Sequence, residues 1–410
     1  MESDLGNDAA DDHRGTMRYI NRYLMRMCLV LCICTLCISA LFSCEVRANE
    51  ASQAPLVKES MLLDVALGEK AVIVGERGHI LVADATDVTL PDASSLGDAL
   101  KQVSVPSKAT LTGVDSVGNT VLAVGHDATI LRSSDGGLSW ELVLSAPELD
   151  RPFLDVLFIS EAEAIAVGAY GLFYRSMDAG LTWQQEQHVS LLSPDDIEYL
   201  ESIADDEEFY QEELNFIFPH FNRLSKSNGR LYLAGEAGLL ASSNDFGRSW
   251  QRYELDYYGS FFDIAQLNSN NGEYLTQQHS QQHTQEHSQR HTQEHSKQHN
   301  IVVAVGLRGN MFISVDDAPW QSIATCMTTS LNSVVTTPLG SFVVGNNGVV
   351  FSVNPDILLS SQSEQGVVNT CKAHPALNKL DTQFSSTISN VFVLGNELTA
   401  LSTTGLHVIK

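Results

Sequence analysis

The sequence predicts an all-β fold, a seven-bladed β-propeller whose last blade is completed by an N-terminal strand. One pattern recurs seven times between residues 71 and 410: an apolar run, a glycine, two variable residues, usually a second glycine, and a run of alternating polarity. Short β-branched strands surround each copy, and all four tryptophans close the same kind of turn. Radial repetition of four-stranded units is typical of propellers.

The copies, in chain order, are AVIVGERGHILVA (71–83), VLAVGHDATILRSSDGGLSW (121–140), AIAVGAYGLFYRSMDAGLTW (164–183), LYLAGEAGLLASSNDFGRSW (231–250), VVAVGLRGNMFISVDDAPW (302–320), FVVGNNGVVFSV (342–353) and LTALSTTGLHVIK (398–410). The last is the most divergent, because Ser402 stands where the others have glycine. Two residues between glycines indicate a tight reversal in which glycine takes a positive φ. Each unit should therefore supply strands a, b and c in chain order.

Three copies continue into Ser-x-Asp-x-Gly-x-Ser/Thr-Trp, here named the Trp turn, and a fourth is one residue shorter. The Trp turns contain Ser133, Asp135 and Trp140; Ser176, Asp178 and Trp183; Ser243, Asp245 and Trp250; and Ser314, Asp316 and Trp320. We expect each turn to join strand c to an outer strand d, with the aspartate accepting backbone N–H groups and the tryptophan packing beneath. One active site needs one constellation rather than four, so these carboxylates are interpreted as structural and no catalytic residue is assigned.

The two ends of the predicted propeller require closure. The seventh copy ends on a strand c, whereas Pro55–Glu59 precedes the first complete unit. We predict that Pro55–Glu59 forms the outer strand of the last blade, which removes an open sheet edge. The propeller should then occupy residues 49–410.

The Trp turns resemble the Asp-box, or BNR, repeats of sialidases and sortilin-type propellers. The fuller unit, AVG-x-x-G-x-I-x-x-S-x-D-G-G-x-x-W, resembles the photosystem II stability and assembly factor family of exported seven-bladed propellers, over about residues 55–410. The resemblance implies a non-enzymatic scaffold that holds a membrane or envelope protein during assembly, without a cofactor. Copies one, six and seven depart from the family pattern because they lack the Trp turn.

Candidate partner-binding residues lie in the turns between strands b and c. These turns should share one face and surround the mouth of the central channel, where variable loops on a rigid scaffold carry function. The candidates are Glu76, Arg77, His126, Asp127, Tyr170, Glu236, Arg308, Asn346 and Asn347. Solvated turn residues without a partner are the alternative interpretation.

An acidic insertion spans residues 186–218, on the same predicted face. Its segment 193–215 holds ten Asp or Glu and no Lys or Arg, and Ser193-Pro194 is a typical helix start. Ile197, Leu200, Ile203 and Ala204 recur on one face of an amphipathic helix. It is either a solvated helix or an acidic arm for a basic partner segment.

A His/Gln-rich tract occupies residues 274–300, within the predicted a–b hairpin of the fifth blade. Histidines recur every four residues, which makes weak metal-binding candidates of His279, His283, His287, His291, His295 and His299. Such a low-complexity repeat is more typical of a loop without a packed core. We therefore assign no metal site.

Composition and the N-terminus limit the function classes. A net charge of −26 disfavours nucleic acid as a partner. Residues 1–48 combine an acidic extension, the basic stretch MRYINRYLMRM and the apolar run CLVLCICTLCISALF, which predict an export signal. We expect a soluble periplasmic or lumenal monomer, with lipidation at Cys44 or a retained N-terminal anchor as alternatives. Five of the seven cysteines lie in this segment; pairing of Cys326 with Cys371 stays open, because outer strands of neighbouring blades diverge.

The main rival is a sialidase-like glycoside hydrolase, followed by a non-catalytic glycan-binding propeller. Glycoside hydrolysis needs paired carboxylates, and sialic acid recognition needs clustered arginines. The Tyr/Phe-Arg-Ile-Pro stretch expected of a sialidase is absent from the sequence. The sequence therefore favours a binding scaffold over a hydrolase.

Overall fold

The computed structural model describes residues 53–84, 99–267, 299–360, 371–394 and 397–409. The chain divides into two units, 1–49 and 50–410, and the predicted export signal lies outside the described residues. No helix in the described ranges is long and apolar enough to cross a membrane.

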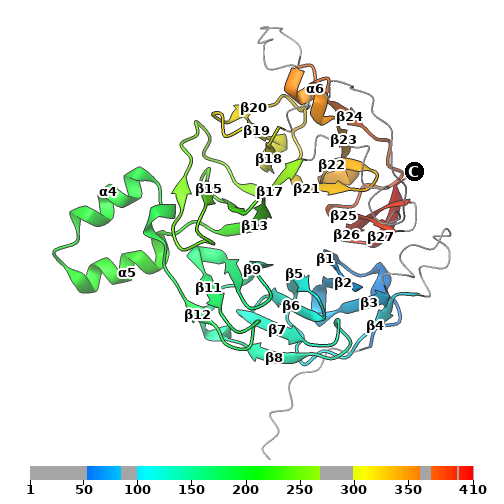
Figure 1. The fold of residues 1–410 in the computed structure, drawn as a ribbon, viewed down its shortest axis with the longest axis horizontal. Coiled ribbons are helices and arrows are strands. Elements are labelled where there is room, and N and C mark those ends of the chain that lie inside the picture. Colours follow the sequence, from blue (N-terminus) through cyan, green and yellow to red (C-terminus); the bar gives the residue numbers. More distant parts are fainter. Residues whose placement is uncertain (1–52, 85–98, 268–298, 361–370, 395–396, 410) are drawn as a thin grey trace, which may run out of the picture. The chain divides into compact units, whose positions relative to one another are not determined.

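The second unit is a seven-bladed β-propeller, as predicted (Figure 1). Six sheets have four antiparallel strands and the seventh has three among the described residues. Strands a contact one another around the centre, so they are the innermost strands. Each sheet then runs outward through b and c to d.

The strand bounds follow the predicted repeat. Strands a are β1 (Leu62–Leu67), β5 (Leu111–Val117), β9 (Phe153–Phe158), β13 (Phe221–Ser227), β17 (Phe261–Leu267), β21 (Leu331–Thr337) and β25 (Ile388–Leu394). Strands b are β2 (Lys70–Gly75), β6 (Thr120–Gly125), β10 (Ala164–Gly168), β14 (Arg230–Gly235), β18 (Ile301–Gly306), β22 (Gly340–Gly345) and β26 (Glu397–Ser402). Strands c are β3 (Ile80–Asp84), β7 (Thr129–Ser133), β11 (Phe173–Ser176), β15 (Leu240–Ser243), β19 (Met311–Val315), β23 (Val350–Val353) and β27 (Gly405–Ile409).

The outer strands d are β4 (Lys101–Gln102), β8 (Glu141–Leu144), β12 (Gln184–Gln185), β16 (Gln251–Arg252), β20 (Gln321–Ser322) and β24 (Leu377–Lys379). The first and sixth blades thus have an outer strand although they lack a Trp turn, contrary to expectation. A longer connection replaces the turn in both. The sixth blade places α6 (Pro355–Ser360) in that connection.

Apolar packing between neighbouring sheets explains why strands b read as continuous apolar runs. Strand β10 is buried at every position, because blades cover both of its faces. One hydrophobic cluster joins Leu122 of the second blade to Phe153 of the third. Another joins Leu62 of the first blade to Phe392 of the seventh, so the core is continuous where the ring closes.

The innermost strands are also joined by hydrogen bonds from side chain to backbone. In the first, third and fifth blades an aspartate accepts an N–H of the next strand a: Asp64 from Val114 (3.1 Å), Asp155 from Leu224 (2.7 Å) and Asp263 from Val334 (2.9 Å). In the other blades a polar side chain donates to a carbonyl of the next strand a: Thr112 to Phe153 (2.8 Å), Asn222 to Phe261 (2.7 Å), Asn332 to Ile388 (2.8 Å) and Ser389 to Leu62 (2.8 Å). Every junction around the ring has at least one such bond, including the junction between the seventh and first blades.

The prediction that Pro55–Glu59 forms the closing strand is wrong. Val57–Glu59 is the 3₁₀ helix η1, which lies against β27 of the last blade. In five blades, strand d ends nine residues before the next strand a begins. The same spacing before Leu62 falls on Gln53, upstream of the predicted segment, and residues 51 and 52 lie outside the described residues.

The acidic insertion contains two helices instead of one, α4 (Pro194–Ser202) and α5 (Glu207–Ile217). The predicted start is confirmed: Ser193 is the N-cap of α4, and its Oγ accepts the N–H of Asp196 at 3.1 Å. Asp206 caps α5 in the same way. The two helices project from the rim beside the third and fourth blades (Figure 1).

Cys326 and Cys371 form a disulfide, which settles the open question about their pairing. Neither cysteine lies in a strand, contrary to the expectation that both lie on outer strands. Cys326 follows β20 and Cys371 precedes β24, and the N–H of His374 donates to the carbonyl of Ala324 at 2.8 Å. The connection of the sixth blade therefore returns to the fifth, and the two Cα atoms are 5.6 Å apart.

We expect the disulfide to stabilise the junction of these two blades. It closes a loop with a sequence separation of 45 residues, so the double variant Cys326→Ser/Cys371→Ser should lose about 2–4 kcal/mol of unfolding free energy. Denaturant unfolding with and without reductant measures this. Reductant should destabilise the wild type and leave the variant unchanged; equal stability of oxidised and reduced wild type would contradict the prediction.

Candidate functional site

The turns between strands b and c share one backbone design. The residue after the first glycine donates its N–H to the carbonyl that precedes strand a, as Glu76 does to Met61 and Ala169 to Pro152, each at 3.0 Å. The first glycine is extended, contrary to the predicted positive φ, and is required by space: a Cβ on Gly75 would lie 2.2 Å from the Met61 carbonyl oxygen. The second glycine, such as Gly78, has the predicted positive φ.

The structure places the candidate residues of these turns on one face, because every turn lies beside the first residue of a strand a. Within a pair, the two residues differ. The first is often half-buried and contacts its own blade: Glu236 accepts the His220 N–H at 3.4 Å, and Asn346 accepts from Asn332 at 2.9 Å. The second is exposed in the left-handed region, as are Arg77, Asp127, Tyr170, Arg308 and Asn347. The exposed surface of the turns thus comes mainly from the second residues.

The turn of the third blade meets the acidic insertion. Arg151 lies over the Tyr170 ring at 5.5 Å and over the Phe216 ring of α5 at 5.7 Å. Its guanidinium also donates to the Asn215 carbonyl at 2.8 Å. The structure therefore joins one candidate residue, Tyr170, to the insertion, a contact that the sequence did not reveal.

The Trp turns are closed networks. In the second blade, Ser133 Oγ accepts the N–H of Gly137 at 2.8 Å and donates to Asp135 at 2.8 Å. Asp135 in turn accepts the backbone N–H of Ser139 at 2.9 Å and its hydroxyl at 2.5 Å. The third and fourth blades repeat these bonds with Ser176 and Asp178, and with Ser243 and Asp245. These carboxylates are occupied by their own turns.

The tryptophans close the same turns. Trp140 donates its indole N–H to the Gly137 carbonyl at 2.8 Å, and Trp183 donates to Gly180 at 3.1 Å. Trp250 is buried like Trp140, but its indole nitrogen has no partner within the described residues. Packing beneath the turn, rather than the indole hydrogen bond, is therefore the feature that these three share.

Each complete Trp turn also packs against the preceding blade. A Cβ on Gly180 would lie 2.4 Å from Leu122, and one on Gly247 would lie 2.9 Å from Ile165, both on strands b of the previous blade. Arg175 of the third blade donates to the carbonyls of Phe246 and Gly247 in the fourth blade's turn, each at 2.9 Å. The turns therefore join neighbouring blades, a role that the sequence argument missed.

The shortened Trp turn of the fifth blade has a different network. Ser314 donates to the Ala318 carbonyl at 2.7 Å, and Asp316 accepts the N–H of Asn300 at 2.9 Å. Asp316 also lies 2.8 Å from Nδ1 of His299, the last histidine of the tract. Trp320 has no indole partner in the described ranges. In this turn, which is one residue shorter, Asp316 therefore bonds the residues just before β18.

The other histidines of the tract, from His279 to His295, lie outside the described residues. The tract does interrupt the a–b hairpin, since β17 and β18 flank it. Within the described residues, no group of three His, Cys, Asp or Glu side chains is placed to hold a metal ion.

A central cluster of Asp64, Asp155, Arg223 and Asp263 was not predicted from the sequence. Arg223 on β13 lies 3.3 Å from Asp64, 3.1 Å from Asp155 and 3.7 Å from Asp263. All four residues follow the bulge of a strand a, a position occupied around the ring by Asp64, Gly113, Asp155, Arg223, Asp263, Ser333 and Asn390. Alignment of the strands a by this position could have revealed the cluster.

Burial and ion pairing have opposite effects on the pKa values of Asp155 and Arg223 in the cluster. Burial raises the pKa of Asp155 to about 7, and the neighbouring Arg223 opposes this shift. Burial likewise raises the pKa of Asp115 to about 6, although Asp115 accepts the N–H of Phe158 at 2.7 Å. The three buried carboxylates facing Arg223 raise the pKa of its guanidinium. The cluster is a charge-paired junction between blades.

Comparisons with known proteins establish the fold. A scan against protein-family models and a search of curated proteins found no match. A solved structure described as "YCF48 bound to D1 peptide" is 13% identical, with a TM-score of 0.54, covering 87% of this chain and 95% of that one. A second, "YCF48 from Cyanidioschyzon merolae", is 12% identical, with a TM-score of 0.53, covering 87% of this chain and 97% of that one. The seven-bladed propeller expected from the resemblance is thus confirmed; at these identities the likeness shows the fold alone.

We expect Asp245→Asn to destabilise the protein by about 1–2 kcal/mol at neutral pH, because bonds to a charged acceptor become neutral ones. The Ser249 hydroxyl and N–H hold the pKa of Asp245 at about 2, below its ordinary value near 3.8. The stabilisation is therefore present above about pH 4 and lost as pH falls through about 2. Denaturant unfolding across this range measures it. Asp256→Asn, an exposed aspartate after β16, is the matched control and should have little effect.

We expect Arg223→Met to lower the free energy of unfolding by about 3–5 kcal/mol at pH 7, because it leaves three buried carboxylates without their cation. The loss of stability should shrink toward pH 5, because Arg223 lowers the pKa of Asp155 in the wild type and its removal lets the folded variant take up a proton more readily than the folded wild type. Thermal and denaturant unfolding at both pH values test this. Arg77→Met is the control for an exposed arginine; an equal loss in both variants would contradict the central role of Arg223.

Proposed function

We propose that the protein is an exported, non-enzymatic scaffold that binds a protein partner and assists assembly or stability of a membrane or envelope complex. The observation that carries the proposal is the whole-fold likeness to a propeller solved with a bound peptide. The repeats resemble those of an assembly-factor family, and this resemblance points in the same direction.

Occupied carboxylates support a binding role over hydrolysis. Glycoside hydrolysis uses two carboxyl groups that flank the scissile bond. The aspartates of the three complete Trp turns accept hydrogen bonds within their turns, and the central aspartates bond backbone and Arg223. These conspicuous acids therefore have structural partners.

We propose the face of the b–c turns as the partner site. Its exposed second residues project from a rigid backbone, while the first residues brace the blades. Variable residues on a fixed frame are the usual basis of propeller recognition, because substitution there leaves the core intact.

Export is part of the proposal. The basic and apolar N-terminal segment supports it, and so does the disulfide, because disulfides persist in oxidising compartments. Cleavage after Ala48 gives a soluble monomer; lipidation at Cys44 or a retained anchor gives a membrane-attached form. Mass spectrometry of the mature N-terminus distinguishes the three.

The test is affinity capture with cross-linking from native envelopes, using a C-terminally tagged chain. A specific membrane or envelope protein should be recovered, and Arg77→Glu/Arg308→Glu should lower its recovery by about tenfold, because both arginines are exposed in the proposed face. Lys101→Glu/Lys379→Glu is the matched control, since these exposed lysines lie on outer strands and give the same charge change. Recovery unaffected by the turn variant, or release of dye from fluorogenic sialosides, would overturn the proposal.

A further inference from the structure

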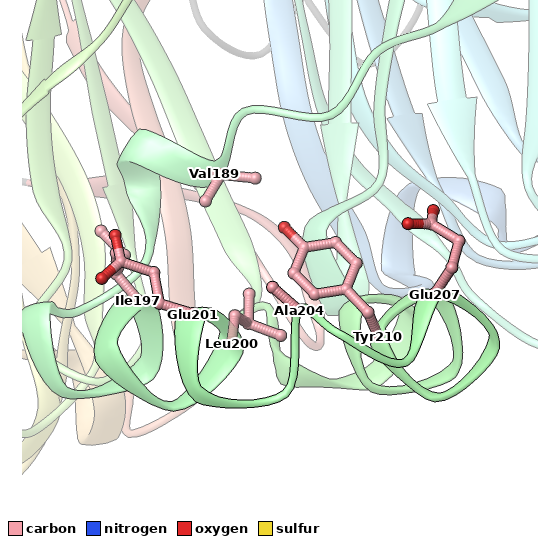
Figure 2. A pocket seen from close by; sticks show the side chains of 7 residues that line it. All are labelled: Val189, Ile197, Leu200, Glu201, Ala204, Glu207 and Tyr210. Carbon is pink, nitrogen blue, oxygen red and sulfur yellow. The ribbon is translucent and has the colours of Figure 1, made fainter.

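A small pocket opens between the two helices of the acidic insertion and the 3₁₀ helix η5 (Val189–Leu191). Its volume is about 260 Å³, below the usual range of small-molecule sites, so it suits one side chain. Val189, Ile197, Leu200, Ala204 and Tyr210 provide an apolar lining. Figure 2 shows Glu201 and Glu207 on opposite sides of this lining.

The pocket is held in place by the propeller core. Leu200 of α4 and Leu214 of α5 are buried in a cluster that also contains Phe221 and Trp250 of the fourth blade. The N-caps Ser193 and Asp206 fix the start of each helix. The hairpin is thus anchored to the blades, and its pocket is largely formed before a partner arrives.

The two helices around the pocket carry a strong negative charge. Segment 193–215 carries ten acidic and no basic residues. Among the described residues, neither Glu201 nor Glu207 forms an ion pair; Glu207 accepts one bond from Gln211 at 3.0 Å. An apolar lining between two carboxylates complements a long aliphatic stem with a cationic end.

We infer that this pocket binds one lysine or arginine side chain from a basic segment of a protein partner. The methylene groups pack against Ile197, Leu200 and Ala204, and the cation is attracted by the carboxylates of Glu201 and Glu207 at the two ends of the lining. Burial of the stem provides contact area, and a carboxylate at either end of the lining can accept a charge-assisted hydrogen bond from the cation. The inference rests on the proposed function, because it names the chemistry of the partner that the scaffold holds.

The location links this pocket to the proposed partner face. Helix α5 contacts η4 (Ala169–Gly171), the b–c turn of the third blade. Phe216, of which 72% is exposed, lies at the end of α5 beside Arg151 and Tyr170. A segment bound across the b–c turns can therefore extend onto the hairpin.

The experiment measures fluorescence anisotropy of labelled nonapeptides that alternate leucine and serine around one central residue. The central residue is lysine, arginine, norleucine or glutamate. The lysine and arginine peptides should bind the purified protein at least about tenfold more tightly than the norleucine peptide, and affinity should fall as salt rises from about 50 to about 500 mM. Equal binding of lysine, norleucine and glutamate peptides, or no binding of any, overturns the inference.

Two variants locate the binding. Glu201→Gln/Glu207→Gln should lower the affinity for the lysine peptide by about tenfold. The control Glu198→Gln/Glu208→Gln makes the same charge change at exposed positions outside the pocket lining and should lower this affinity by less than about twofold. Ala204→Lys places a cation in the pocket and should abolish selectivity for the basic peptides. Equal effects of the two charge variants would show a general attraction by the helices and overturn the pocket.

The outcomes separate this inference from the proposed function. If the captured envelope protein is still lost with Arg77→Glu/Arg308→Glu but unaffected by Glu201→Gln/Glu207→Gln, the scaffold function holds and the pocket inference fails. If the basic peptides bind in the pocket but no envelope protein is captured, the assembly role fails and the side-chain site remains.

Discussion

Hydrogen bonds between neighbouring innermost strands are the constraint on which the rest of the propeller depends. A sheet that must pack against two neighbours needs a fixed position at the axis, and here one side chain of each strand a bonds the backbone of the next. The bonding side chain lies either in the bulge of its strand a, as Thr112 does, or directly after it, as Asp64 does, so the local irregularity is part of the design. The bond from Ser389 to Leu62 closes the ring at the axis. The seventh and first blades are therefore joined at the axis, independently of any outer strand from the N-terminal segment.

A second set of junctions lies nearer the rim. The Trp turns pack a glycine onto strand b of the previous blade, and Arg132 and Arg175 donate to carbonyls of the next blade's turn. Glycine is required at Gly180 because its φ is positive and a Cβ would enter Leu122. The aspartates keep these turns in shape, which explains why the acids recur with the blades. Their repetition reflects the number of junctions and carries no catalytic meaning.

The repeat predicted the fold, whereas contacts between repeats could not be predicted from one copy at a time. Strands b and c and the helix start at Ser193 follow from local patterns, so they are found in place. The central cluster was missed because Asp64, Asp155, Arg223 and Asp263 are far apart in the chain and meet only through the ring. The Cys326–Cys371 disulfide was left open for a related reason: an inserted connection, not a strand, brings Cys371 back. The closing segment was misplaced because it was taken as the residues directly before the first complete unit, whereas the nine-residue spacing between a strand d and the next strand a points to Gln53.

This division between repeated and inserted residues also bears on recognition. Residues that recur in every blade are occupied with the neighbouring blade, so they offer little free bonding capacity to a partner. Specificity must then come from positions that differ between copies: the exposed second residue of each b–c turn and the insertion found in one blade. The α4–α5 hairpin suits this role, since it is the only helical hairpin in the described part of the chain, contacts a b–c turn, and has no acid in a salt bridge among the described residues. A scaffold built in this way can change partners by changing its insertion, because no junction of the ring depends on that segment's charge.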